Sequence, residues 1–152
     1  MYFEDLKEGQ VLTTRKRIVT TTDIDIFATM TGAVNPLFLS KDYAVSAKMR
    51  DRVAPGILTA GLMFGSLYQL GLFDNIVALT GIDKLRFLLP VFPGDTIESK
   101  VVVESKKETG KPDRGVVVFH ATCTNQESAK VLEGELTFLF LRNTSSTRKA
   151  TE

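Results

Sequence analysis

The sequence predicts an α+β fold in which one long apolar helix packs against an antiparallel sheet. Residues 56–73, GILTAGLMFGSLYQLGLF, contain no charged side chain, and a helix that is apolar nearly all round must be buried on most of its sides. Four segments rich in β-branched and aromatic residues follow this helix. Short polar turns join the last three of them, which favours an antiparallel meander, and the separation of strands from helices is typical of an α+β domain.

Each expected element has its own local signal. The expected elements are a strand at 8–20, helices at 21–32, 40–49 and 57–70, two strands within 78–110, and single strands within 114–127 and 129–143. Thr22 or Asp23 can cap the first helix, which Gly32 ends, and Ser40 can cap the second. The motif FPGD at 92–95 is a turn that separates the first two strands after the long helix.

Charge and cysteine content exclude several classes of protein. The chain has 152 residues and a net charge of +1, which gives no sign of a nucleic-acid partner or of binding to an anionic membrane. The single cysteine, Cys123, rules out an internal disulfide, and no cluster of metal ligands accompanies it. Its neighbours alternate like a strand, so we expect a buried, inert thiol. The sequence therefore indicates neither a metal nor a cofactor.

The chain is long enough for one domain, which we expect to span residues 1–142, followed by a disordered polar tail at 143–152. The N-terminal segment is mixed and acidic, unlike a signal peptide, so we expect a cytoplasmic protein. The long apolar segment approaches the length of a membrane span, but its glycines and its Ser66, Tyr68 and Gln69 favour a helix buried in a protein core. The glycosylation triplet that begins at Asn143 is then a chance match.

Three motifs carry a resemblance to a known family. FATMTGAVNPLFLSKDYA at 27–44 resembles the hydratase signature of MaoC-like dehydratases and (R)-specific enoyl-CoA hydratases, in which the stretch runs Gly-Asp-x-Asn-Pro-x-His. RVAPGILTAGL at 52–62 is similar to the start of the central helix in that family, usually Val-His-Gly. RFLLPVFPGDTI at 86–97 resembles its strand-turn-strand. The resemblance spans about residues 2–141 and implies the hotdog fold, a curved antiparallel sheet wrapped around one central helix.

The departures from this signature concern the catalytic residues. Where the resemblance places the catalytic Asp and His, this chain has Ala33 and Phe38, and where the family has His before the helix glycine it has Pro55. In the family, the Asp and His activate the water that adds to the enoyl double bond and return a proton to the α-carbon. Neither Ala nor Phe can transfer a proton. We therefore expect no catalytic residue in this motif.

The features that remain are binding features. The resemblance assigns to Gly56 or Ile57 a backbone N–H that grips the thioester carbonyl oxygen, and a helix start also carries a partial positive charge. Asn35 is retained, and we expect it to hold the turn by side-chain to backbone bonds. Phe38 could itself lie where the reactive carbon of a substrate would be. The predicted substrate-binding residues are thus Gly56, Ile57, Asn35 and Phe38.

The other polar candidates have structural interpretations. His120 shares a strand face with Val118 and Thr122, away from the expected site. Asp42 favours the dipole of the helix that Ser40 caps, and Asp83 and Asp95 flank strands as turn or cap residues. A weaker functional interpretation is that the phosphates of coenzyme A meet a cation of the segment KMRDR, namely Lys48, Arg50 or Arg52.

Three functions remain open on the sequence. The favoured one is a protein that binds an acyl thioester of coenzyme A or acyl carrier protein without hydrating it, as a homodimer or in a hetero-oligomer with a catalytic paralogue. The second is an active dehydratase or thioesterase with non-standard residues, although residues 55–73 lack the carboxylate that hotdog thioesterases usually need. The third is a structural or regulatory module in which Ala33 and Phe38 are ordinary core residues.

Overall fold

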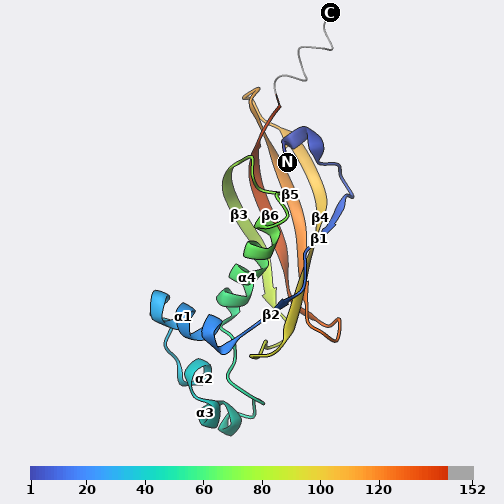
Figure 1. Cartoon of the computed structure of the whole chain (residues 1–152). Coiled ribbons are helices and arrows are strands. Elements are labelled where there is room, and N and C mark those ends of the chain that lie inside the picture. Colours follow the sequence, from blue (N-terminus) through green and yellow to red (C-terminus); the bar gives the residue numbers. More distant parts are fainter. Residues whose placement is uncertain (144–152) are drawn as a thin grey trace, which may run out of the picture.

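A computed structural model describes residues 1–143, which form an antiparallel sheet with one long helix against it (Figure 1). The expected tail, apart from Asn143, and most of the glycosylation triplet lie outside the described residues. The elements in chain order are η1 (Phe3–Asp5), β1 (Val11–Thr13), β2 (Arg17–Ile18), α1 (Thr21–Thr31), α2 (Pro36–Leu39), α3 (Lys41–Ser46), α4 (Gly56–Tyr68), β3 (Ile76–Phe87), β4 (Thr96–Glu108), β5 (Arg114–Thr124) and β6 (Lys130–Leu141).

The sheet has the strand order β1-β4-β5-β6-β3, with β2 also paired to β4. All these pairings are antiparallel, so the meander expected for the last three strands is confirmed. The chain returns from α4 into β3 on the far side of β6. Strand β3 therefore pairs with β6 along one edge and is the long terminal strand of the sheet, a position that favours pairing with another chain.

Alternation along the strands builds the core between the sheet and α4. In β5, Phe119 and Ala121 are fully buried while the intervening His120 points to the other face, as the sequence predicts. Phe73, which follows α4, stacks on Phe138 of β6 with ring centroids 4.1 Å apart. Helix α4 lies along one face of the sheet, and α1, α2 and α3 project beyond its end (Figure 1).

Two local expectations were wrong in their details. The strand expected at 8–20 is split into β1 and β2, which pair with different parts of β4. The first helix is capped by Thr20, because its side chain accepts the N–H of Asp23 while the Asp23 carboxylate accepts the N–H of Thr20. Gly32 ends this helix as predicted, in the left-handed conformation with φ of 75°.

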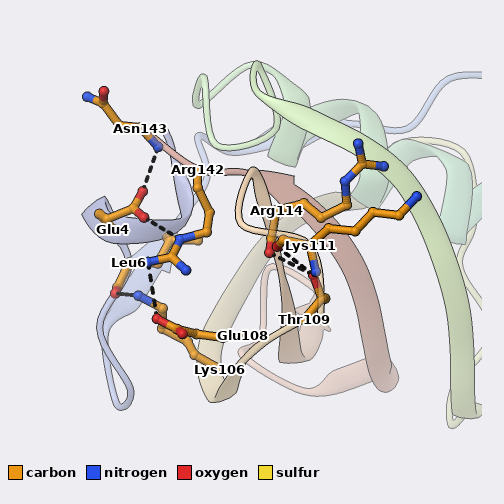
Figure 2. A network of polar contacts seen from close by, with 9 residues as sticks. All are labelled: Glu4, Leu6, Lys106, Glu108, Thr109, Lys111, Arg114, Arg142 and Asn143. Atoms are coloured by element: carbon orange, nitrogen blue, oxygen red, sulfur yellow. Dashed lines mark hydrogen bonds and ion pairs between the residues drawn. The ribbon is translucent and has the colours of Figure 1, made fainter. Parts of the chain in front are cut away.

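The N-terminal segment is fastened across the ends of β4 and β6 by a polar network (Figure 2). The carboxylate of Glu4 accepts bonds from Arg142 at 2.8 Å and from the N–H of Asn143 at 2.9 Å. The ammonium group of Lys106 donates to the carbonyl of Leu6 and lies 4.3 Å from the ring centroid of Phe3. This network closes the end of the core that lies opposite the start of α4.

Two further expectations concern the single cysteine and the possibility of a membrane-spanning helix. Cys123 is fully buried, as expected, and burial raises the pKa of its thiol although Ser99 hydrogen-bonds it. Among the helices of residues 1–143, none combines the length and the apolar run that a bilayer crossing requires.

Candidate functional site

The first turn of α4 presents unpaired backbone donors. Pro55 precedes the helix, and no side chain caps it. The first N–H of the helix to find an acceptor is that of Thr59, which bonds to the carbonyl of Pro55 at 3.1 Å. Within the described residues, the N–H groups of Gly56, Ile57 and Leu58 have no acceptor. Such a helix start carries a partial positive charge and accommodates an oxygen with negative character.

A hollow of about 220 Å³ lies beside this helix start. Its lining is apolar apart from one threonine, and no side chain in it titrates; the lining residues are Val53, Ala54, Gly56, Thr59, Phe87, Leu88, Leu89, Pro90, Val91 and Val131. The ring of Phe87 lies directly against Gly56, because a β-carbon added there would come within 2.9 Å of two ring carbons. The hollow can therefore receive an apolar group next to the free N–H groups.

Backbone hydrogen bonds fix the walls of this hollow. The N–H of Ala54 donates to the carbonyl of Val91 at 2.8 Å, and the N–H of Leu88 donates to the carbonyl of Val131 at 2.8 Å. These bonds join the segment before α4 to the segment after β3, and the latter to the start of β6. The hollow is thus formed by the fold itself, as is usual for small-molecule sites.

The motif at 31–38 folds into a tight connection between α1 and α2. The side chain of Asn35 accepts the N–H of Leu37 at 2.9 Å and caps α2, which begins with Pro36. This is the turn-holding role that the sequence predicts for Asn35. The N–H of Ala33 donates to the hydroxyl of Thr31 at 3.2 Å. The turn is therefore held by its own polar side chains.

Arg52 ties this turn to the segment that leads into α4. Its Nε donates to the carbonyl of Phe38 at 2.6 Å, and its guanidinium also pairs with Asp25 of α1. One residue later, the N–H of Val53 donates to the carbonyl of Leu37 at 3.1 Å. The side chain of Arg52 is only 14% exposed, so it serves these contacts rather than binding a phosphate from solvent.

The predicted site residues are only partly brought together. Gly56 lines the hollow, and Ile57 follows it with its side chain largely exposed. Phe38 is half-buried and packs against the core, and Ala33 is half-buried in its turn. The lining of the hollow includes none of the other three residues, Ala33, Asn35 and Phe38. The bonds donated by the Arg52 side chain and the Val53 N–H hold the turn near the helix start, but the turn contributes no wall of the hollow.

Arg50 and Asp95 form a separate polar hollow that shares Leu89 and Pro90 with the apolar one. Asp95 is 3% exposed and accepts bonds from the N–H of Phe92, from Gln126 and from Arg50. Burial alone would raise the pKa of Asp95, but these bonds outweigh burial and leave the pKa below its usual range. Asp95 is thus the turn residue that the sequence predicts.

The remaining candidates lie away from the apolar hollow. His120 lies on the outer face of the sheet, 3.9 Å from Glu133. Asp42 is exposed in the first turn of α3, which Ser40 caps through the N–H of Tyr43, as predicted. Lys48 is exposed and is not among the residues that line either hollow. None of these groups adds an acid or base to the start of α4.

Sequence reasoning missed most of the lining of the hollow. Residues 87–91, FLLPV, begin with the last residue of β3 and are apolar, yet Phe87, Leu88 and Leu89 are each close to half exposed. An apolar run that ends at a proline just after a strand is the signal that could have indicated them. Val131 was missed because it reads as an ordinary core position of β6.

An antiparallel sheet that packs around one long helix is the architecture of hotdog-fold proteins. The chain superimposes on part of a Mycobacterium tuberculosis protein with a double hotdog fold, at a TM-score of 0.84 and 20% identity over 95% of this chain and 45% of that one. The chain also superimposes on a monoamine oxidase regulatory protein from Archaeoglobus fulgidus, at a TM-score of 0.87 and 31% identity over 94% of this chain and 95% of that one.

Sequence comparison gives the family within this class. The model of the MaoC like domain matches residues 3–125. An (R)-specific enoyl-CoA hydratase from Rhodospirillum rubrum is 35% identical over 139 residues, which cover 91% of this chain and 90% of the hydratase. The chain therefore belongs to the MaoC-like domain family, and the resemblance noted in its motifs is confirmed.

Proposed function

We propose that this protein binds an acyl thioester, carried by coenzyme A or acyl carrier protein, and does not hydrate it. One observation carries the proposal: Gly56, whose N–H is one of the unpaired donors at the start of α4, lines an apolar hollow that has no titratable side chain. A carbonyl next to an apolar chain is the chemical pattern of an acyl thioester. The match to an (R)-specific enoyl-CoA hydratase supports the same class of ligand.

In this proposal the thioester oxygen accepts a hydrogen bond from Gly56 or Ile57. The positive end of the helix dipole favours this oxygen, and the apolar walls exclude water and so strengthen the interaction. The acyl chain takes the hollow between Ala54 and Val131. These residues supply binding and orientation, and they supply no proton.

The absence of hydration follows from the residues at the positions that the family signature assigns to catalysis. Ala33 and Phe38 can neither activate water nor return a proton to the α-carbon. A positioned acid or base contributes about 10²–10⁴ in rate, so the loss of both should remove most of the hydration activity. The positions of His120, on the outer face of the sheet, and of Asp42, on α3, support the same conclusion, because neither residue lines the hollow.

The proposal includes a partner chain, either a second copy or a catalytic paralogue. Strand β3 ends the sheet, and its Val77, Leu79 and Ile82 are each at least 40% exposed. An exposed apolar edge of this length is a surface for strand pairing.

A cytoplasmic location remains a prediction from the sequence.

The test measures binding and turnover on the same preparation. We expect calorimetry to show that butyryl-CoA or butyryl-acyl carrier protein binds more tightly than the free carrier, and that the absorbance of crotonyl-CoA stays flat for minutes. Equal affinity for free and acylated carriers, in both series, contradicts thioester binding. A turnover of several per second with crotonyl-CoA contradicts the non-catalytic assignment.

Variants of the first turn locate the carbonyl. Gly56→Pro and Ile57→Pro each remove one N–H, and proline is tolerated at the start of a helix. Gly56→Ala and Ile57→Ala are the matched controls, because they keep the N–H, and Gly56→Ala brings the same β-carbon against Phe87 that Gly56→Pro does. We expect one proline variant to bind about 5-fold to 10-fold more weakly than its alanine control, the effect of one hydrogen bond. No difference in either pair contradicts the assigned contact.

A further inference from the structure

One side chain in the lining of the apolar hollow is polar, that of Thr59 in α4. Phe87, Leu88 and Leu89 form the mouth of the hollow and are 44–49% exposed, whereas Thr59 is only 3% exposed and belongs to its buried part. Within residues 1–143, the hydroxyl of Thr59 has no hydrogen-bond partner. A hydroxyl that is taken out of water without a partner is unfavourable and needs an explanation.

The hydroxyl of Thr59 behaves differently from other hydroxyls in the helices of this protein. Those of Thr29, Thr31 and Ser66 each donate to the backbone carbonyl four residues earlier, at 2.8, 2.6 and 3.0 Å. The corresponding carbonyl for Thr59 is that of Pro55, which accepts the backbone N–H of Thr59 at 3.1 Å and no bond from its hydroxyl. The hydroxyl of Thr59 is therefore free to donate to another acceptor.

The oxygen of Thr59 retains access to the space of the hollow. Among the residues of 1–143 that are not exposed, one fully enclosed side-chain nitrogen or oxygen atom lacks a partner, and it is Nη1 of Arg17 rather than Oγ1 of Thr59. Thr59 lines the hollow and is otherwise almost completely covered. The hollow is therefore the space from which a ligand atom can reach Oγ1.

Helix geometry places this hydroxyl beside a free backbone donor. Thr59 follows Gly56 by three positions, and residues three apart are neighbours on one face of a helix. Helical side chains also lean toward the N-terminus, over the preceding turn. Both residues line the hollow, and the N–H of Gly56 has no acceptor within the described residues. The N–H of Gly56 and the hydroxyl of Thr59 can thus address the same ligand oxygen.

We propose that the hydroxyl of Thr59 donates a second hydrogen bond to the carbonyl oxygen of the bound thioester. A carbonyl oxygen has two lone pairs and can accept from both groups at once. The inference rests on the proposed function and adds to it a side chain that selects for the carbonyl. Because every other side chain in the lining is apolar, Thr59 is the residue of the lining that can make such a bond.

The experiment compares a ligand that has the carbonyl with one that lacks it. The probes are butyryl-coenzyme A and S-butyl coenzyme A, a thioether in which a methylene replaces the carbonyl, and calorimetry measures both. Thr59→Val removes the hydroxyl and keeps the shape of the side chain, whereas Thr59→Ser keeps the hydroxyl. We expect Thr59→Val to bind the thioester about 5-fold to 10-fold more weakly and to change thioether affinity less than about twofold. Thr59→Ser should stay within about threefold of the natural protein for both probes.

Thr122→Val is the matched control, because Thr122 is also buried but lies in β5, outside the lining of the hollow. It should leave both affinities unchanged. An equal loss for thioester and thioether in Thr59→Val would overturn the inference, since the hydroxyl would then act through packing, and so would no loss for either. Both of these outcomes leave thioester binding intact. Butyryl-coenzyme A that binds the natural protein no more tightly than free coenzyme A would overturn the proposed function and the inference together.

Infrared spectroscopy reports on the same contact independently of affinity. A hydrogen bond to a carbonyl oxygen lowers the stretching frequency of the carbonyl, and a ¹³C label at this carbon identifies the band. At saturating protein, labelled butyryl-coenzyme A should absorb at a lower frequency on the natural protein than on Thr59→Val. Equal frequencies would overturn the inference. Should circular dichroism show that Thr59→Val does not fold, Thr59→Ala replaces it in both measurements, with Thr122→Ala as its control.

Discussion

The aromatic ring of Phe87 at the end of β3 packs against the backbone of Gly56 at the start of α4. A β-carbon at position 56 would come within 2.9 Å of this ring, closer than such contacts normally occur. The position therefore needs glycine for steric reasons, since the helix start must approach the strand end closely. This contact couples the donor end of α4 to the mouth of the hollow.

Gly56→Ala should therefore destabilise the fold unless the ring is removed. We expect a loss of about 1–2 kcal/mol for the single change, as for other overpacked positions. In a Phe87→Ala background the same change should be neutral or slightly stabilising, because alanine is the better helix former. A double-mutant cycle by urea denaturation measures the coupling. Equal effects of Gly56→Ala in both backgrounds would contradict the steric explanation.

The side chain of Arg52 should contribute more to the stability of the fold than its ion pair with Asp25 alone. Arg52→Ala removes the bond to the carbonyl of Phe38 as well as the pair, and we expect it to destabilise the protein by about 1–3 kcal/mol. Asp25→Ala leaves the bond to Phe38 in place, and its carboxylate is mostly exposed, so it should cost less than about 1 kcal/mol. Urea denaturation compares the two variants. Equal losses would show that the bond to the turn contributes nothing.

Asp95 should make stability depend on pH at the acidic end. Its folded pKa lies below the ordinary value, so its contribution is complete above about pH 5 and is lost as the pH falls through the folded pKa, below about 4. We expect Asp95→Asn to be less stable than the natural protein at pH 7 by about 1–3 kcal/mol, with the difference shrinking below about pH 4.

Urea denaturation at a series of pH values from neutral to acidic measures this difference. Glu127→Gln, an exposed acid on the neighbouring turn, is the control and should shift stability by less than about 0.5 kcal/mol at any pH. A constant difference between the natural protein and Asp95→Asn across the series would show that the ionised carboxylate does not stabilise the fold.

The free edge of β3 should hold a second chain. We expect light scattering to give a particle larger than the 16.8 kDa of one chain. Leu79→Arg places a charge on this edge and should shift the protein toward the monomer. Ile18→Arg, at a position of β2 that is 60% exposed, should leave the particle size unchanged. A natural protein that is monomeric at micromolar concentration would contradict the role of the edge.

Strong periodic patterns made much of the fold predictable. The central helix follows from its uncharged apolar run, and the four later strands follow from alternation and turn residues. The break between β1 and β2 could not be predicted, because residues 14–16 are compatible with a continuous strand. Thr20 was missed as a cap since the reciprocal bonds with Asp23 become visible only once the helix start is fixed.

The site was less predictable than the fold because it depends on contacts between distant segments. Gly56 was identified from the helix start. Its neighbours Phe87 and Val131 come from β3 and β6, and only the strand order, with β3 beside β6, brings those segments to the helix. A linear motif also could not show that Ala33 and Phe38 fall outside the lining of the hollow.

Restoring the two missing proton-transfer groups tests most directly whether the turn at 31–38, which lines no part of the hollow, still aims its side chains at a thioester bound there, so that the site lacks only the means to hydrate it. The double variant Ala33→Asp with Phe38→His should hydrate crotonyl-CoA measurably, while each single variant should do far less, because such groups act as a unit. Circular dichroism first establishes that the variants fold, since Phe38→His removes about 1–3 kcal/mol of apolar burial. The decrease in enoyl absorbance is the measurement. The proposal expects a clear rate in the double variant and none in the natural protein. A folded double variant that binds butyryl-CoA and shows no hydration above background would show that the turn at 31–38 does not aim these side chains at the bound thioester, and would contradict the claim that only the two groups are missing.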